Sequence, residues 1–227
     1  MADLTRLQKQ LGYRFGDPAL LQLALTHRSA SGRNNERLEF LGDALINFVA
    51  AAALYECRPK AEEGALSRLR ASLVREESLA FLARELKLSD VLTLGESELK
   101  SGGFRRDSIL ADAFEAVMGA ILLDGGFAAA SAAARQQFAA MLSNLPDAET
   151  LKDPKTRLQE WLQARARPLP HYTVLSEQGP AHARRFHVRC ELADEPASTE
   201  AIASSRRGAE QQAAADLLHQ LENPVHA

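Results

Sequence analysis

Cysteine is scarce in this chain of 227 residues: it has only Cys57 and Cys190, far apart in the sequence. So few cysteines exclude a disulfide-rich secreted domain and favour a reducing compartment. The N-terminus lacks the long apolar segment of a signal peptide, and no uncharged apolar run reaches the ~20 residues that cross a bilayer. We therefore expect a cytoplasmic protein without a membrane partner.

An excess of basic charge, which marks many nucleic-acid-binding proteins, is also missing, since the net charge is −3 at pH 7. Residues 1–150 contain 17 Lys and Arg against 20 Asp and Glu, and residues 151–227 contain ten of each. If the acids of the first region gather at one site, the rest of its surface is comparatively basic. The net charge therefore does not exclude a nucleic acid as partner.

Helical periodicity extends over almost all of residues 4–141, and no segment there is a convincing strand. Breaks that contain Gly or short polar runs separate the helical segments. The polar stretch 143–150 contains Pro and lacks periodicity, so it indicates a linker. The predicted breaks are 31–35, 95–97, 101–103 and 124–126.

The pattern changes after Asp153, where Asp and Pro mark the start of a helix. Three strand-like segments follow, HYTVLSEQ, ARRFHVRCELAD and STEAIAS, and then a helix from about Ser205 to Leu221. In the second segment apolar residues from Phe186 to Leu192 alternate with polar ones, as in a half-buried strand. The order α-β-β-β-α predicts a small α+β module after an all-α domain. We place the domains at 1–146 and 153–222, with a linker at 147–152.

Carboxylates lie on one side of the otherwise apolar segment NERLEFLGDALINF. On a helix, Glu36, Glu39 and Asp43 fall within an arc of about 60°. A second helical segment has Asp112 and Glu115 three residues apart, which makes them surface neighbours. The residues expected on the opposite, core-facing sides are Leu38, Leu41, Leu45, Phe48 and Val49 in the first helix, and Leu110, Phe114, Val117 and Ile121 in the second.

If these two helices pack together, Glu39, Asp43, Asp112 and Glu115 converge, with Glu36 and Glu63 nearby. Two carboxylates ~4 Å apart repel by about 4 kcal/mol at an effective dielectric constant near 20, so such a cluster needs protons, water or a cation. Oxygen ligands without Cys or His suit Mg²⁺ or Mn²⁺ rather than zinc. A solvated helix face is the alternative explanation for these acids.

A di-iron redox site is disfavoured, because such sites in helix bundles use Glu-x-x-His pairs and neither acidic helix has one. We interpret the lone His27 as a core or capping residue. Phe40 lies about 40° from Glu36 on the acidic side of its helix. An exposed Phe beside carboxylates indicates a protein interface, and the alternative is a groove within the same subunit.

The segment NERLEFLGDAL resembles the signature of bacterial ribonuclease III, a double-stranded-RNA endonuclease. LALTHRSA before it, LSRLRASLV after it and ILADAFEAVMGAILLDGG further on resemble the family in the same order. DPKTRLQEWLQ and SSRRGAEQQAAADLL resemble the two helices of the double-stranded-RNA-binding domain that ends these enzymes. The resemblance covers nearly the whole chain.

The resemblance implies Mg²⁺, with Mn²⁺ as a substitute, bound by Glu39, Asp43, Asp112 and Glu115, and it implies catalytic roles for Asp43 and Glu115. It assigns Glu36 and Glu63 as accessory acids at the site or in dimer contacts. It also implies a homodimer, with Phe40 at the interface. Family members cut both strands of duplex RNA to leave 5′-phosphates and short 3′-overhangs, and their usual targets include ribosomal RNA precursors.

The same resemblance predicts which residues of the second domain contact duplex RNA, which is recognised mainly by shape, through 2′-hydroxyl and phosphate groups. Two departures from the family pattern predict weak binding with a shallow salt dependence. The stretch EAIASS lacks the usual glycines, and Gly208 replaces a lysine. The alternatives are an RNA-binding protein without nuclease activity and a helical redox protein. The predicted RNA contacts are Thr156, Gln159, Glu160, His182, Ser205, Arg206 and Arg207.

Overall fold

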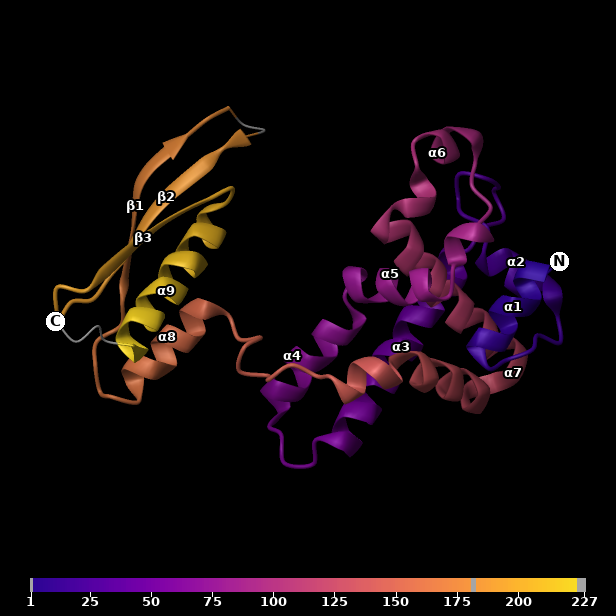
Figure 1. The fold of residues 1–227 in the computed structure, drawn as a ribbon, viewed down its shortest axis with the longest axis horizontal. Helices are drawn as coiled ribbons and strands as arrows, with labels where there is room; N and C mark the ends of the chain where they lie inside the picture. The colour runs from indigo at the N-terminus through magenta and orange to yellow at the C-terminus, as the bar shows by residue number, and fades with distance from the viewer. Residues whose placement is uncertain (1, 181–182, 224–227) are drawn as a thin grey trace. The chain divides into compact units, whose positions relative to one another are not determined.

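The computed structural model describes residues 2–180 and 183–223. The chain forms two compact units, Met1–Thr150 and Leu151–Ala227. The first unit is helical, and the second combines helices with a sheet (Figure 1). The predicted order of an all-α domain and an α+β module is therefore confirmed.

Seven α-helices and two short 3₁₀ turns make up the described part of the first unit. Its only strand-like pairing there is an isolated parallel bridge between Thr26 and Thr93. The predicted break at 95–97 is partly wrong, because Glu96 and Ser97 begin a short helix. The elements are α1 (Ala2–Leu11), α2 (Pro18–Ala24), α3 (Glu36–Cys57), α4 (Glu63–Val74), α5 (Glu76–Glu85), η1 (Leu88–Asp90), α6 (Glu96–Lys100), η2 (Gly103–Arg105) and α7 (Asp107–Ser143).

The long helix α7 is kinked at Gly126, whose φ of 78° and ψ of 177° are not helical. The predicted break at 124–126 is therefore confirmed as a kink. Just before it, the Asp124 carboxylate accepts hydrogen bonds from Tyr13 Oη (2.7 Å) and from the backbone N–H groups of Gly16 (2.7 Å) and Asp17 (2.9 Å). These bonds fasten the loop between α1 and α2 to α7.

Helices α3 and α7 cross with their backbones in contact, and glycines permit this approach. A Cβ on Gly42 would lie 1.8 Å from the carbonyl oxygen of Glu115, and one on Gly119 would lie 2.2 Å from that of Leu38. Glycine within a helix costs about 1 kcal/mol relative to alanine, and here it allows two central helices to touch. The crossing brings the acidic stretch of α3 beside that of α7.

Most of the predicted core-facing residues are buried. Leu38, Leu45 and Val49 of α3 are at most 5% exposed, and the four predicted residues of α7 are at most 1% exposed. The prediction was wrong for Phe48, which is 60% exposed and packs edge-to-face against Phe127 with ring centroids 5.7 Å apart. Leu41 is only partly buried.

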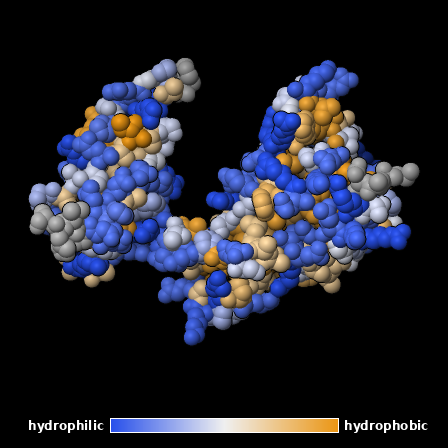
Figure 2. Space-filling view, in the orientation of Figure 1, coloured by the Kyte–Doolittle hydropathy of each residue, from blue (hydrophilic) through white to orange (hydrophobic). Residues whose placement is uncertain are grey.

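Helices α3 and α7 are both long and apolar enough to cross a membrane by length and composition alone. Each packs instead against other helices of the first unit, and the two form its most extensive contact. Core helices of globular proteins pass the same compositional test. On the face drawn in Figure 2, hydrophobic side chains interrupt an otherwise hydrophilic surface.

The second unit is an antiparallel sheet of order β1-β2-β3 that shares one hydrophobic core with two helices. Asp153 begins the first helix by accepting a hydrogen bond from Lys155 N (2.9 Å). In β2, Val188, Cys190 and the following Leu192 are buried, which confirms the predicted alternation. The elements are α8 (Pro154–Gln163), β1 (His171–Gln178), β2 (Arg185–Glu191), β3 (Ser198–Ala203) and α9 (Arg206–Glu222).

Candidate functional site

Three carboxylates from the two crossing helices converge at one point of the first unit. Glu39 of α3 and Asp112 and Glu115 of α7 each offer a carboxylate oxygen, and these atoms lie within 4.8 Å of one another. All three side chains are half-buried. The contact of α3 with α7 at Gly42 and Gly119 places them there, since Gly42 lies directly against Glu115.

The crowding disfavours the charged forms of these acids. Burial, followed by the charges of Asp43, Asp112 and Glu39, raises the pKa of Glu115 to about 8. Burial is also the largest cause of the raised pKa values of Glu39 and Asp112, ahead of neighbouring acids. A group of acids that resists ionisation together is a site that a cation would stabilise.

The other predicted acids lie outside this group. Asp43 is exposed, and its Oδ1 accepts a hydrogen bond from Asn47 Nδ2 (2.8 Å), although its charge still raises the pKa of Glu115. Glu36 is exposed and pairs with Arg28 at 3.6 Å. Glu63 is exposed at the start of α4 and accepts a hydrogen bond from Ser67 Oγ (2.8 Å). The structure thus unites three of the four predicted metal ligands.

Sequence reasoning missed several residues around the acids. Gly42 and Gly119 position the carboxylates, and the signal available for them was the cost of glycine inside an apolar helix. Glu76, in the first turn of α5, is close enough for its charge to raise the pKa of Asp112. An acid in the first turn of a helix is ordinary, because it complements the helix dipole, so Glu76 carried no signal in the sequence.

Phe40 protrudes beside the acidic stretch, with 80% of its surface exposed. It borders a hollow of about 930 Å³, also lined by leucines of α2, α3 and α7. Leu123, at 58% exposure, belongs to the same surface. Polar residues also line the hollow, and an exposed aromatic side chain beside leucines with a polar margin is typical of a protein interface. The leucines that line the hollow are Leu20, Leu23, Leu38, Leu41 and Leu123, and the polar residues are Arg33, Asn34, Glu36 and Arg37.

In the second unit, the predicted contacts on α8 share one exposed side of that helix. Thr156, Gln159 and Glu160 are all exposed and spaced three and four residues apart. Glu160 is already paired, since its Oε2 lies 2.7 Å from Lys152 Nζ. His182, the predicted minor-groove contact, lies outside the described residues.

The start of α9 holds the other predicted contacts. Ser205 is its N-cap and accepts a hydrogen bond from Gly208 N (3.0 Å), so its hydroxyl is engaged in capping. Arg206 Nε lies 2.8 Å from Glu210 Oε1, and Arg207 Nη2 lies 3.4 Å from Asp153 Oδ2. Both guanidinium groups therefore stand on the surface with their charges partly balanced.

Acidic residues also join α9 to α8. Glu210, only 8% exposed, binds Lys155 Nζ through its second oxygen (2.5 Å). Asp153 accepts a further hydrogen bond from Gln211 Nε2 (2.7 Å). Because Lys155 and Asp153 belong to the start of α8, these contacts fix the two helix starts relative to each other, and with them the predicted RNA contacts.

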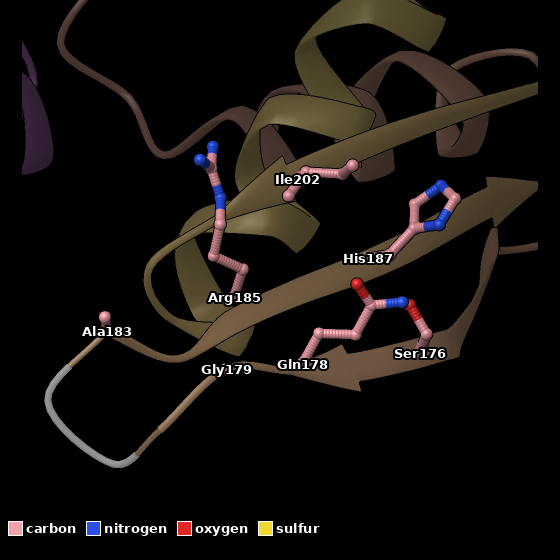
Figure 3. Close-up of a pocket in the computed structure, with 7 residues that line it drawn as sticks. All are labelled: Ser176, Gln178, Gly179, Ala183, Arg185, His187 and Ile202. Atoms are coloured by element: carbon pink, nitrogen blue, oxygen red, sulfur yellow. The ribbon is translucent and has the colours of Figure 1, made fainter.

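A pocket of about 550 Å³ lies on the outer face of the sheet, away from the helices (Figure 3). Gln178, Ser176 and Arg185 line it, together with His187, which pairs with Glu200 at 2.8 Å. Among the residues that the structure describes, none of those predicted to be functional lines it.

Two family models match the chain. Residues 17–142 match ribonuclease-III-like proteins, and residues 154–221 match the double-stranded RNA binding motif. A protein named Ribonuclease 3 from Hahella chejuensis is 56% identical over 217 residues, which cover 96% of each chain. Ribonuclease 3 from Pasteurella multocida is 52% identical over 220 residues, which cover 97% of this chain and 98% of its relative.

Among solved structures, the nuclease domain of ribonuclease III from Campylobacter jejuni is similar, with a TM-score of 0.58 and 45% identity. The match covers 59% of this chain and 95% of that one. Fold and matches together define a nuclease domain followed by a double-stranded-RNA-binding module. The chain belongs to the ribonuclease III family of double-stranded-RNA endoribonucleases, as the sequence resemblance predicted.

Proposed function

We propose that this protein hydrolyses phosphodiester bonds of double-stranded RNA with Mg²⁺, and that Mn²⁺ substitutes for it. The convergence of Glu39, Asp112 and Glu115 is the observation that carries the proposal. The donor set consists of carboxylate oxygens from two rigid helices, which suits a hard divalent cation. The raised pKa of all three groups supports a cation as the missing partner.

In this proposal Glu39, Asp112 and Glu115 hold the cation, and Asp43 joins them by releasing its hydrogen bond to Asn47. A divalent cation supplies acidified water and neutralises charge on the leaving oxygen. The protein's own part is to hold the carboxylates close together at a fixed place beside the RNA strand, where a cation would replace the protons that their raised pKa values favour. We propose accessory roles for Glu36 and Glu63, on the strength of the family resemblance alone.

We further propose a homodimer that forms through the surface around Phe40. In a two-fold interface the same patch meets itself, so it must contain both a projection and a matching recess. Phe40 provides the projection, and the hollow beside it, lined in part by leucines, provides the recess. The related Campylobacter jejuni nuclease domain has a region involved in dimer formation, which supports this assignment.

Duplex RNA is proposed to bind the second unit along α8, at the start of α9 and at His182. Thr156, Gln159 and Glu160 contact the groove, and Arg206 and Arg207 contact phosphates. The products carry 5′-phosphates and short 3′-overhangs, and precursors of ribosomal RNA and other structured transcripts are the substrates in the cytoplasm. These last points rest on membership of the family.

The test is cleavage of an end-labelled RNA duplex in Mg²⁺, in Ca²⁺ and in chelator. We expect short duplex products in Mg²⁺ only. Glu115→Gln, which keeps the size of the side chain, should abolish cutting without loss of RNA binding in a gel shift. Glu85→Gln on the exposed side of α5 is the matched control and should cut normally. A gel shift without cutting in any metal would identify a binding protein instead.

A further inference from the structure

A pocket of about 420 Å³ lies beside the three acids and shares two of them, Glu39 and Asp112. Its remaining wall holds two further acids, Glu36 and Glu98, each paired with an arginine, and a group of hydrogen-bond donors. The donors come from the loop before α3 and from the segment that leads into α7. The donor residues are His27, Arg28, Ser29, Asn35, Arg106 and Ser108.

Asn35 is the least usual of them. It is 3% exposed and lies at the N-cap of α3, yet its side chain does not cap the helix. The neighbouring Asn34 accepts the hydrogen bond from Glu36 N (3.0 Å) instead. Within residues 2–180 and 183–223, no protein group makes a hydrogen bond with the Asn35 amide. The amide atoms are still accessible to solvent, and Asn35 lines the pocket, so the amide faces the pocket. The amide N–H is therefore free to donate to a ligand in this pocket.

His27 provides a second donor, because hydrogen bonds fix the tautomer of its ring. The backbone N–H of Ser29 donates to His27 Nδ1 (3.2 Å), and Ser29 Oγ lies 2.8 Å from the same nitrogen. Ser29 Oγ in turn accepts from Gly95 N (2.9 Å), which leaves its own proton for Nδ1. Because Nδ1 is thus an acceptor, the proton of the neutral ring sits on Nε2. The backbone of His27 is held in place by its bond to Thr93 O (3.0 Å).

We propose that Asn35 and His27 hold a phosphate group of the RNA strand next to the bond that is cut. This inference rests on the proposed function, since it takes the three acids to mark the place of cleavage. The Asn35 amide N–H and the His27 Nε2–H are donors, and phosphate oxygens are pure acceptors. Arg28 and Arg106 line the same pocket and balance the charges of Glu36 and Glu98, with which they pair.

For His27, interpreted from the sequence as a core or capping residue, this proposal adds a contact with the substrate. His27 is half-buried, and one ring nitrogen is used internally while the other is left for a ligand. Its role is that of a substrate-contacting residue that sets where the strand lies. No proton transfer is assigned to it.

The experiment uses the full-length protein and duplexes that carry one uncharged methylphosphonate linkage, placed in turn at each position around the cut. Cleavage is measured at single turnover in Mg²⁺, and affinity is measured in Ca²⁺. We expect the wild-type protein to be slowed about tenfold or more by one particular linkage beside the cut. Asn35→Ala should be slowed similarly on the unmodified duplex and should lose its sensitivity to that linkage, because the shared contact is already gone.

His27→Gln retains a donor near the position of Nε2 and should keep most of the cleavage rate, whereas His27→Ala should not. Asn144→Ala, at the end of α7, is the control for loss of an asparagine. If Asn35→Ala fails to fold, the linkage scan of the wild-type protein against His27→Ala decides the matter. Variants that are slowed but keep full sensitivity to the linkage would reduce both residues to a structural role and overturn the inference.

The two proposals fail in different ways. Failure of the wild-type protein to cut any duplex would overturn the proposed function and this inference with it. Normal cutting by the wild-type protein, indifferent to every modified linkage, would overturn this inference alone.

Discussion

Glu115 links the stability of the metal-free protein to pH. Its pKa is raised from 4.5 to about 8, mainly by burial and then by the charges of Asp43, Asp112 and Glu39. The folded protein therefore binds this proton more tightly than the unfolded chain does. Stability should fall as the pH rises from about 4.5 to about 8, and Glu115→Gln should remove part of this loss.

The size of the effect follows from the shift. A rise in the pKa of Glu115 from 4.5 to about 8 corresponds to a loss of at most about 5 kcal/mol in the free energy of unfolding when the group is fully ionised. Because Glu115 is only half-buried, water screens part of the unfavourable electrostatic interaction. We therefore expect a loss of stability of roughly 1–2 kcal/mol at pH 8. The variant should thus be more stable than the wild-type protein at pH 8 in chelator, and nearly equal to it at pH 5.

The assay is urea denaturation at pH 5, 6, 7 and 8, in chelator and in Mg²⁺. Added Mg²⁺ should stabilise the wild-type protein at pH 8 and have little effect on the variant, because the cation replaces the proton at this site. Glu85→Gln should follow the wild-type curve. A variant that is less stable than the wild-type protein at pH 8 in chelator would refute the reasoning.

Three further outcomes are expected. Gly42→Ala should lower the free energy of unfolding by at least about 3 kcal/mol in urea denaturation, since its Cβ would meet the Glu115 carbonyl oxygen at 1.8 Å. The control Gly64→Ala should be neutral or stabilising, because its Cβ meets only a flexible arginine at 3.4 Å. Phe40→Ala should weaken dimerisation at least tenfold in analytical ultracentrifugation, whereas the control Phe81→Ala, on α5, should not. If Phe40→Ala dimerises as tightly as the wild-type protein, Phe40 is not at the interface. RNA binding should have a salt slope shallower than about −3, because the two arginines that begin α9 are already paired with acids; a steeper slope would contradict this.

Much of the fold was accessible from the sequence because its signals are local. Helical spacing predicted the helical character of residues 4–141, strand-like patterns predicted β1 to β3, and the Asp153 cap predicted the start of α8. The breaks that separate α1 from α2, α3 from α4 and α4 from α5 were not predicted. Phe48 was misplaced because the helical wheel describes only one helix. Whether a residue at the margin of the apolar face is buried depends on the neighbour that covers it, and here Phe127 leaves it exposed.

The sequence indicated which residues form the site better than it indicated how they are arranged. Spacing indicated that Glu39, Asp112 and Glu115 would meet if the two helices packed together. The sequence could not reveal that Gly42 makes this meeting close, or that the side chain of Asp43 turns to Asn47. Such features arise from contacts between segments that are distant in the sequence, and the unpartnered amide of Asn35 is of the same kind.

The central claim is that Glu39, Asp112 and Glu115 hold a divalent cation. Its most direct test is anomalous diffraction from crystals of the protein grown with Mn²⁺. We expect one strong peak or more within about 2.1 Å of oxygens from all three carboxylates, and none at this place in Glu115→Gln. A protein that cuts RNA in Mn²⁺ while its crystals show the ion elsewhere, or not at all at these acids, would contradict the account.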